Sequence, residues 1–223
     1  MARQVLRPTG PAPSLAPYAG CGAVLAPPSP EWSERLPLLV GARASLRELD
    51  VTDAPALMSH LNTLEVQRYI APPPDTVDSF ENFILWAQCE RARGRYACYG
   101  VVPHGMTAPV GVFQLRQIEG GFTTAEWGFA LSAAFWGAGY FTDAARLVVD
   151  FAVDTVGVRR LEARSAIENG RGNGALRKLG AVQEGILRRA FRKGECVMDA
   201  ALWTILADEW RQGRAFRRRI VVH

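Results

Sequence analysis

Residues 125–157 read AEWGFALSAAFWGAGYFTDAARLVVDFAVDTVG, and this stretch decides the fold. Its first part, residues 125–131, is mostly apolar and β-prone, as in a buried strand. A short loop follows, with glycines at positions 137 and 139. Beyond the loop, apolar residues recur at helical spacing, and Gly157 stands where a glycine commonly ends a helix. The stretch therefore predicts a strand, a tight glycine turn and an amphipathic helix.

The start of such a helix suits an anionic ligand. Free backbone N–H groups and the positive end of the helix dipole lie there, and glycines let the backbone approach a ligand closely. An ordinary strand-to-helix connection would use the same glycines without binding anything. The turn is therefore a candidate phosphate site with a purely structural alternative.

The string WGAGYFT at residues 136–142 resembles the W-G-x-G-Y-x-T acyl-CoA pyrophosphate loop of the GNAT acetyltransferase superfamily. It is most similar to the ribosomal-protein N-acetyltransferase branch (RimJ/RimL-like). Gly139 matches the central glycine of the generic pattern Gln/Arg-x-x-Gly-x-Gly/Ala, whereas Trp136 and Phe141 depart from its first and last positions. The resemblance implies that the pyrophosphate of acetyl-CoA binds the turn at Gly137, Ala138, Gly139, Tyr140, Phe141 and Thr142.

A second segment, ENGRGNGALRKLG at residues 168–180, carries the same resemblance. The family pattern Asn-x-x-Ser/Ala-x-x-Val/Leu-Tyr/Leu-x-Lys-x-Gly is matched at Asn169, Leu176, Lys178 and Gly180. The resemblance implies that Asn169 bonds the pantetheine arm, although asparagine at such a place more commonly caps its helix. Many relatives carry a tyrosine, used as a general acid, where this chain has Leu176.

Composition places the chain among ordinary globular proteins. It has 223 residues, of which 48% are hydrophobic and 22% charged, as expected for one domain with an extension. No apolar run approaches the roughly 20 residues of a membrane helix, and the N-terminus lacks a signal-peptide core, so we expect a cytoplasmic protein away from membranes. The four cysteines form no C-x-x-C pair and three histidines give no zinc spacing, so we expect reduced thiols and no metal. The net charge of +4 would favour an anionic ligand such as CoA, but it could equally reflect basic side chains on a solvated surface.

Three regions of the chain differ in composition. Residues 1–35 are rich in Pro, Ala and Gly and predict an irregular arm. The acetyltransferase domain is expected over residues 36–210. Residues 211–223 form an arginine-rich tail, which could contact RNA phosphates or be a solvated basic end. Three side chains of the arm could dock on the domain or on a second subunit, namely Tyr18, Leu25 and Trp32.

Within the domain, alternation and turn signals predict a mixed α/β fold. One helix is expected to start at Thr52-Asp53 and a second at Thr76 or Asp78. A hairpin meander feeding an α/β crossover implies a sheet that is antiparallel first and parallel at the ligand-binding end. The GNAT resemblance implies helices on the flanks and parallel strands splayed around acyl-CoA. The expected strands span residues 43–49, 96–102, 109–116, 125–131, 160–167 and 196–206.

Transfer of an acetyl group from a thioester to an amine needs a neutral amine, a polarised carbonyl and a proton for the thiolate. Glu126 is the candidate base, with a cross-strand charge partner as the alternative. Backbone groups of Phe129 and Leu131 would pair with pantetheine, and the Leu131 N–H would polarise the thioester carbonyl, unless both serve only sheet pairing. Because no covalent nucleophile is required, Cys98 and Cys196 are interpreted as structural.

The sequence thus predicts an acetyl-CoA-dependent N-acetyltransferase that acts on a primary amine, either a protein N-terminus or a small molecule. With leucine at position 176, water, Tyr140 or another group must protonate the leaving thiolate. Two other functions stay open. A non-catalytic acyl-CoA-binding domain is suggested by the missing tyrosine, and a ribosome- or RNA-associated module by the basic tail. A homodimer is compatible with the sequence, whereas nucleic acid is not the expected main partner.

Overall fold

The computed structural model describes residues 31–118, 122–193 and 196–220, with side chains omitted from 215 onwards. Most of the proline-rich arm, including Tyr18 and Leu25, lies outside these residues, as do residues 194–195.

The chain forms runs of strands and runs of helices. In order they are α1 (Glu31–Glu34), β1 (Leu39–Val40), β2 (Ala44–Glu48), η1 (Val51–Asp53), α2 (Ala54–Leu61), α3 (Leu64–Gln67), α4 (Val77–Ala92), β3 (Tyr96–Pro103), β4 (Gly111–Gln117), β5 (Thr124–Leu131), η3 (Ala133–Phe135), α5 (Tyr140–Asp150), η4 (Phe151–Val156), β6 (Arg160–Ala166), α6 (Gly170–Leu179), β7 (Val182–Lys193), β8 (Cys196–Leu206) and α7 (Ala207–Ile220).

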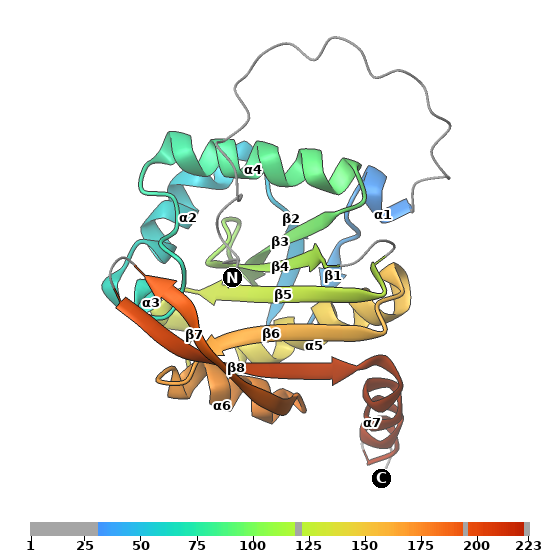
Figure 1. The fold of residues 1–223 in the computed structure, drawn as a ribbon. Helices are drawn as coiled ribbons and strands as arrows, with labels where there is room; N and C mark the ends of the chain where they lie inside the picture. Colours follow the sequence, from blue (N-terminus) through green and yellow to red (C-terminus); the bar gives the residue numbers. More distant parts are fainter. Residues whose placement is uncertain (1–30, 119–121, 194–195, 221–223) are drawn as a thin grey trace, which may run out of the picture.

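The strands of the described residues join one mixed sheet, in the order β1-β2-β3-β4-β5-β6-β8-β7. β5 and β6 pair in parallel, whereas the other neighbours are antiparallel. Helices α2 and α4 cover one face, and α5 and α6 cover the other (Figure 1). The predicted mixed α/β fold is thereby confirmed.

Two apolar clusters, one on each face, follow from strand alternation. On β4, Val112 packs with the helices α2 and α4, while its neighbour Phe113 packs on the opposite side against α5. Successive side chains of a strand point to opposite faces, so one strand supplies both clusters. The sheet is therefore buried on both sides at its centre, and it holds the end of β5 in a fixed position.

The helix caps match the prediction in one case and differ in another. Thr76 caps α4, as expected, by accepting a bond from the Ser79 N–H. Asp53 holds the N-cap position of α2, as expected, but its side chain makes no cap bond there. The capping bonds belong to η1, where the Asp50 carboxylate accepts from the Thr52 N–H and the Asp53 carboxylate accepts from the Asp50 N–H. This reciprocal arrangement is a capping box, shifted upstream of the expected cap.

Both ends of the described chain dock on the domain. Trp32 is buried and makes edge contacts with the rings of Phe122 and Phe151, at centroid distances of 5.4 and 6.3 Å. The arginine-rich tail begins within helix α7, which lies at the C-terminal corner of the fold (Figure 1). Arg214 Nη1 binds Asp150 at 2.8 Å and Asp154 at 2.5 Å. The start of the tail is therefore packed against α5 and η4.

Candidate active site

The parallel strands β5 and β6 separate shortly after they meet. Their pairing is confined to residues 124–126 and 160–162. Beyond that point β5 stays with β4 as far as the Gly111–Leu131 pair, and β6 stays with β8 as far as the Ala166–Ala200 pair. A gap therefore opens between β5 and β6.

Backbone groups of β5 face this gap. The Ser132 N–H donates to the Val110 carbonyl on the β4 side, at 2.9 Å. Because backbone groups alternate between the two edges of a strand, Phe129 and Leu131 direct theirs to the β6 side, where pairing has ended. Ordinary sheet pairing, the alternative for these two residues, is thus absent between β5 and β6 at this point. The Leu131 carbonyl accepts a bond from the Trp136 indole N–H at 2.8 Å.

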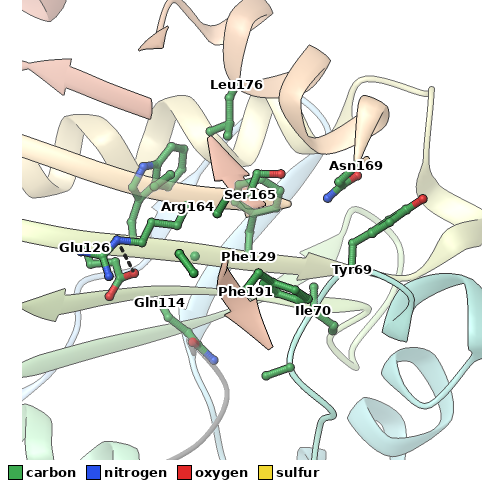
Figure 2. A pocket seen from close by; sticks show the side chains of 16 residues that line it. Tyr69, Ile70, Gln114, Glu126, Phe129, Arg164, Ser165, Asn169, Leu176 and Phe191 are labelled. Carbon is green, nitrogen blue, oxygen red and sulfur yellow. Dashed lines mark ion pairs between the residues drawn. The ribbon is translucent and has the colours of Figure 1, made fainter. Parts of the chain in front are cut away.

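A cavity occupies the gap and joins residues from distant parts of the chain (Figure 2). Three residues that the sequence analysis placed in the site, Glu126, Phe129 and Asn169, line it together with Leu176. Its far wall comes from segments that the sequence analysis did not assign, before α4 and in β7. The lining residues are Tyr69, Ile70, Ala71, Gln114, Glu126, Trp127, Gly128, Phe129, Ala163, Arg164, Ser165, Asn169, Leu176, Ala190, Phe191 and Ala200.

The glycine turn lies at the end of β5, at the start of α5. Gly137 and Gly139 have φ values of +76° and +85°, a left-handed conformation that glycine adopts without strain. The Asp143 carboxylate, in the first turn of α5, accepts bonds from the backbone N–H groups of Ala42, Arg43 and Ala44 at 2.8 to 3.3 Å. The helix start is therefore fixed to the β1–β2 turn.

The two departures from the family pattern have structural roles. Trp136 bonds the end of β5 through its indole, as described above. The Phe141 ring packs on Phe129 and Phe113, with centroid distances of 4.5 and 5.8 Å. The bulk of Phe141 is thus taken up by the aromatic cluster on the α5 face, away from the glycine turn.

Two arginines that the sequence analysis did not select lie beside the turn. The Arg171 guanidinium stacks over the Trp136 ring, with Cζ 4.2 Å from the centroid. The Arg43 Nε atom would lie 3.0 Å from a Cβ added to Gly139. The generic pattern has a glutamine or arginine at position 136, where this chain has a tryptophan. That missing polar residue was the signal in the sequence that a cation reaches the turn from another segment.

Glu126 is 2% exposed and takes part in an ion-pair cluster. Arg116, its direct partner across the β4–β5 ladder, donates to Glu126 Oε2. Arg164 Nε lies 3.9 Å from the other carboxylate oxygen, Oε1 (Figure 2). Glu126 is therefore a cross-strand charge partner, and it also borders the cavity.

Asn169 and Leu176 sit at the α6 side of the cavity. Asn169 Oδ1 accepts a bond from the Gly172 N–H at 2.9 Å, so it caps α6. A Cβ on Gly172 would lie 2.4 Å from Asn169 Nδ2, so the glycine permits this close approach. Leu176 is 1% exposed and offers an apolar surface to both the cavity and the core.

Cys98 is buried in the core, and burial raises the pKa of its thiol well above the usual range. It is thus a poor nucleophile, in agreement with a structural role. Cys196 is exposed at the start of β8. Within the described part of the chain, no group of three or more potential ligands is placed to hold a metal ion.

A family model, the acetyltransferase (GNAT) domain, matches residues 43–182, which is more than half of the chain. This chain belongs to the GNAT acetyltransferase family. It is accordingly an acyltransferase, as predicted from the two motifs. The matched region runs from β2 to the first residue of β7 and includes the glycine turn, the gap and α6.

Several known proteins are similar to this GNAT domain. An uncharacterised N-acetyltransferase, p20 of Bacillus licheniformis, is 23% identical over 75% of this chain and 95% of its own length. Mycobacterium smegmatis RimJ, solved in complex with CoA-disulfide, has a TM-score of 0.73 and 21% identity over 81% of this chain and 91% of its own. The ribosomal-protein-S5-alanine acetyltransferase of Vibrio fischeri has a TM-score of 0.71 and 16% identity, over 78% of this chain and 98% of its own.

Proposed function

We propose that this GNAT enzyme transfers an acetyl group directly from acetyl-CoA to a primary amine, either a protein N-terminus or a small molecule. The observation that carries the proposal is the cavity in the gap between β5 and β6, which Glu126, Phe129, Asn169 and Leu176 line together. A site at the carboxyl ends of parallel strands is where open α/β sheets bind their ligands. The relative solved with CoA-disulfide supports the choice of cosubstrate.

Acetyl-CoA would supply the activated acetyl group, and the residues of the chain would hold it. In this proposal the N–H groups of Gly137, Ala138, Gly139, Tyr140, Phe141 and Thr142 bind its pyrophosphate at the start of α5. Such groups lack partners within their own helix. The free edge of β5 at Phe129 and Leu131 pairs with pantetheine, and the Leu131 N–H polarises the thioester carbonyl. Asn169 Oδ1 caps α6, so its Nδ2 donates to the pantetheine arm.

Glu126 is proposed as the base that accepts a proton from the amine, directly or through water. Its Oε2 atom accepts from Arg116, whereas among the described residues Oε1 has only the ion pair with Arg164 at 3.9 Å. That distance is too long for a hydrogen bond, so lone pairs of Oε1 remain for a proton. The charge-partner role and the base role therefore fall on different oxygens.

Leu176 itself cannot donate a proton to the leaving thiolate. Tyr140, one of the expected substitutes, contacts Phe135 and does not line the cavity. Hydroxyl groups of the lining come from Tyr69 and Ser165. We take water as the donor, because a free thiol titrates near pH 8.5 and the protonated product is favoured near neutrality without a positioned protein acid.

Leu176→Tyr is expected to raise kcat by about threefold to tenfold. This is a small part of the ~10²–10⁴-fold rate enhancement that a well-positioned general acid supplies. Leu176→Phe, with the same ring and no hydroxyl, is the matched control and should give no gain. Leu176→Ala should leave the rate per folded enzyme nearly unchanged while lowering stability by about 2–5 kcal/mol, because the leucine is buried. Steady-state kinetics and thermal melts measure both effects. Loss of the reaction in Leu176→Ala with CoA still bound would show that packing, not proton supply, matters here.

Arg171→Ala is expected to raise the Kd for CoA by about tenfold at low salt, since it removes one charged contact near the phosphates. The effect should shrink as salt screens the charge. Arg177→Ala is the control, because Arg177 lies on the same helix and stacks over Trp203 at 5.6 Å. Titration calorimetry at two salt concentrations makes the comparison. Equal losses in both variants would mean that Arg171 acts only through overall charge.

A screen of amines, followed by release of the CoA thiol and by the mass of the acetylated product, tests the proposed function. Thiol release that depends on an amine would eliminate the non-catalytic acyl-CoA-binding alternative. CoA binding without turnover of any amine would favour that alternative, which the leucine at position 176 suggests.

A role in binding RNA is weakened by the ion pairs that Arg211 and Arg214 make with Asp154. The described residues contain no helix that is long and apolar enough to cross a bilayer, and a cytoplasmic location stays part of the proposal.

A further inference from the structure

Gln114 on β4 is a buried polar side chain without a partner. It is 1% exposed, and neither Oε1 nor Nε2 makes a hydrogen bond within the described residues. Buried amides are nearly always hydrogen-bonded, so an unpaired one calls for an explanation. Gln114 lines the cavity and lies directly across the β4–β5 ladder from Gly128. Because Gly128 has no side chain, its position on β5 places none between the amide and the cavity.

Other residues that line the same cavity differ in chemistry from those of the glycine turn. Arg164 Nε is also buried and donates no hydrogen bond to any described residue. Arg164 makes two long ion pairs. Its Nε lies 3.9 Å from Glu126 Oε1, and its Nη2 lies 3.8 Å from Glu162 Oε2. Ile70 and Phe191 supply apolar walls (Figure 2). The cavity thus has in its lining one amide that donates and accepts, one cationic donor and apolar walls.

A hydrogen bond joins the two segments that form the apolar walls, although they are far apart in the sequence. Lys193, at the end of β7, donates through Nζ to the Gln67 carbonyl of α3 at 2.5 Å. Figure 1 shows β7 reaching the region of α3 on this side of the sheet. The far wall of the cavity is therefore a fixed surface, against which a bound molecule is oriented.

We infer that Gln114 is a specificity-determining residue of the acceptor site, and that it selects amines with a carbonyl group one carbon away from the nitrogen. Gln114 Oε1 accepts from the amine N–H and Nε2 donates to the carbonyl oxygen, so both halves of the amide find partners. Arg164 Nε supplies a second donor for the same oxygen. This inference rests on the proposed function, because it describes the acceptor of that reaction.

Other amines fit the same groups less well. A plain alkylamine would pair with Oε1 alone and leave two buried donors without acceptors. A site built for a hydrogen bond rejects the analogue that lacks it more strongly than an apolar site rejects a missing methylene. A polyamine would bring further positive charge beside Arg116 and Arg164. Acceptors of the amino-acid amide or peptide type are therefore favoured over both.

The unpaired amide also makes a prediction about stability that needs no substrate. Gln114→Met keeps the volume and removes the buried polar group, so the ligand-free protein should melt about 2–4 °C higher. Gln88→Met is the control, because Gln88 Nε2 donates to the Leu49 carbonyl at 2.8 Å and its loss should lower the melting temperature. A glutamine with a purely structural role at position 114 would behave as Gln88 does.

The kinetic test compares glycinamide with n-propylamine, which have similar size, at saturating acetyl-CoA. In Gln114→Met, kcat/KM for glycinamide should fall about tenfold or more, and that for n-propylamine by no more than about threefold. Comparing variant with wild type for each amine cancels their difference in basicity. The Kd for acetyl-CoA should not change.

The outcomes separate this inference from the proposed function. An equal fall for both amines, or a lower melting temperature in Gln114→Met, would overturn the role of Gln114 while leaving the proposed function in place. Failure of the wild type to acetylate either amine, or any member of a broader amine panel, would overturn the proposed function and this inference together.

Discussion

Gly139→Val is expected to abolish CoA binding, with a Kd at least about 100-fold above that of the wild type. Gly139 has a φ of +85°, and a Cβ there would lie 3.0 Å from the Arg43 Nε atom. A β-branched residue in this left-handed conformation costs about 1–3 kcal/mol and pushes the turn out of shape. Losing two charge-assisted bonds to phosphate, each worth about 1.5–3 kcal/mol, accounts for the fall in affinity.

Gly105→Val is the matched control for backbone strain. Gly105 also has a φ of +85°, but a Cβ there would meet no atom within 4 Å. It lies in the turn between β3 and β4, outside the residues that line the cavity. This variant should lose a similar amount of stability and bind CoA normally. A folded Gly139→Val protein with unchanged CoA affinity would count against a pyrophosphate site at the turn.

Glu126→Gln is expected to lower kcat by about 10²-fold while the affinity for acetyl-CoA stays within about threefold. The amide cannot accept a proton from the amine, yet it keeps the size of the carboxylate. The variant should also lose some stability, because Arg116 and Arg164 face a neutral group in its place. Since both arginine side chains are about one-third exposed, water limits that loss.

Arg116→Gln separates the two roles of Glu126. It removes the cross-strand partner and leaves the carboxylate, so it should cost a comparable stability with a much smaller fall in kcat. If Glu126 were only a charge partner, both variants would lose the same activity and the double variant would recover it. A rate within a few-fold of the wild type in Glu126→Gln, across the pH range, would remove Glu126 from the mechanism.

Features that depend on local sequence patterns could be predicted from the sequence. The strand at residues 125–131, the glycine turn and the helix after it, the Thr76 cap and the last strand all correspond to elements of the structure. Even so, the final residues before Gly157 form a π-helix, Phe151–Val156. Gly157 does end the helix, as predicted, but the apolar pattern does not distinguish π from α hydrogen bonding.

Features that depend on distant contacts could not be predicted in this way. Arg43 reaches the glycine turn because Asp143 binds the β1–β2 turn, about 100 positions away in sequence. Arg171 reaches it by stacking on Trp136. Gln114 is one of several polar residues on its strand, and only the register with Gly128 shows that its amide borders the cavity. Such residues become candidates once the register and the gap are known.

Hydrogen exchange of the β5 amides, measured with and without acetyl-CoA, tests most directly whether the cosubstrate lies between β5 and β6. The account predicts that the Phe129 and Leu131 amides, which face the gap, exchange more slowly when acetyl-CoA is bound. The Val101 amide, on the buried strand β3, should not change and serves as the internal reference. Protection elsewhere in the domain, with Phe129 and Leu131 unaffected at saturating acetyl-CoA, would contradict the account.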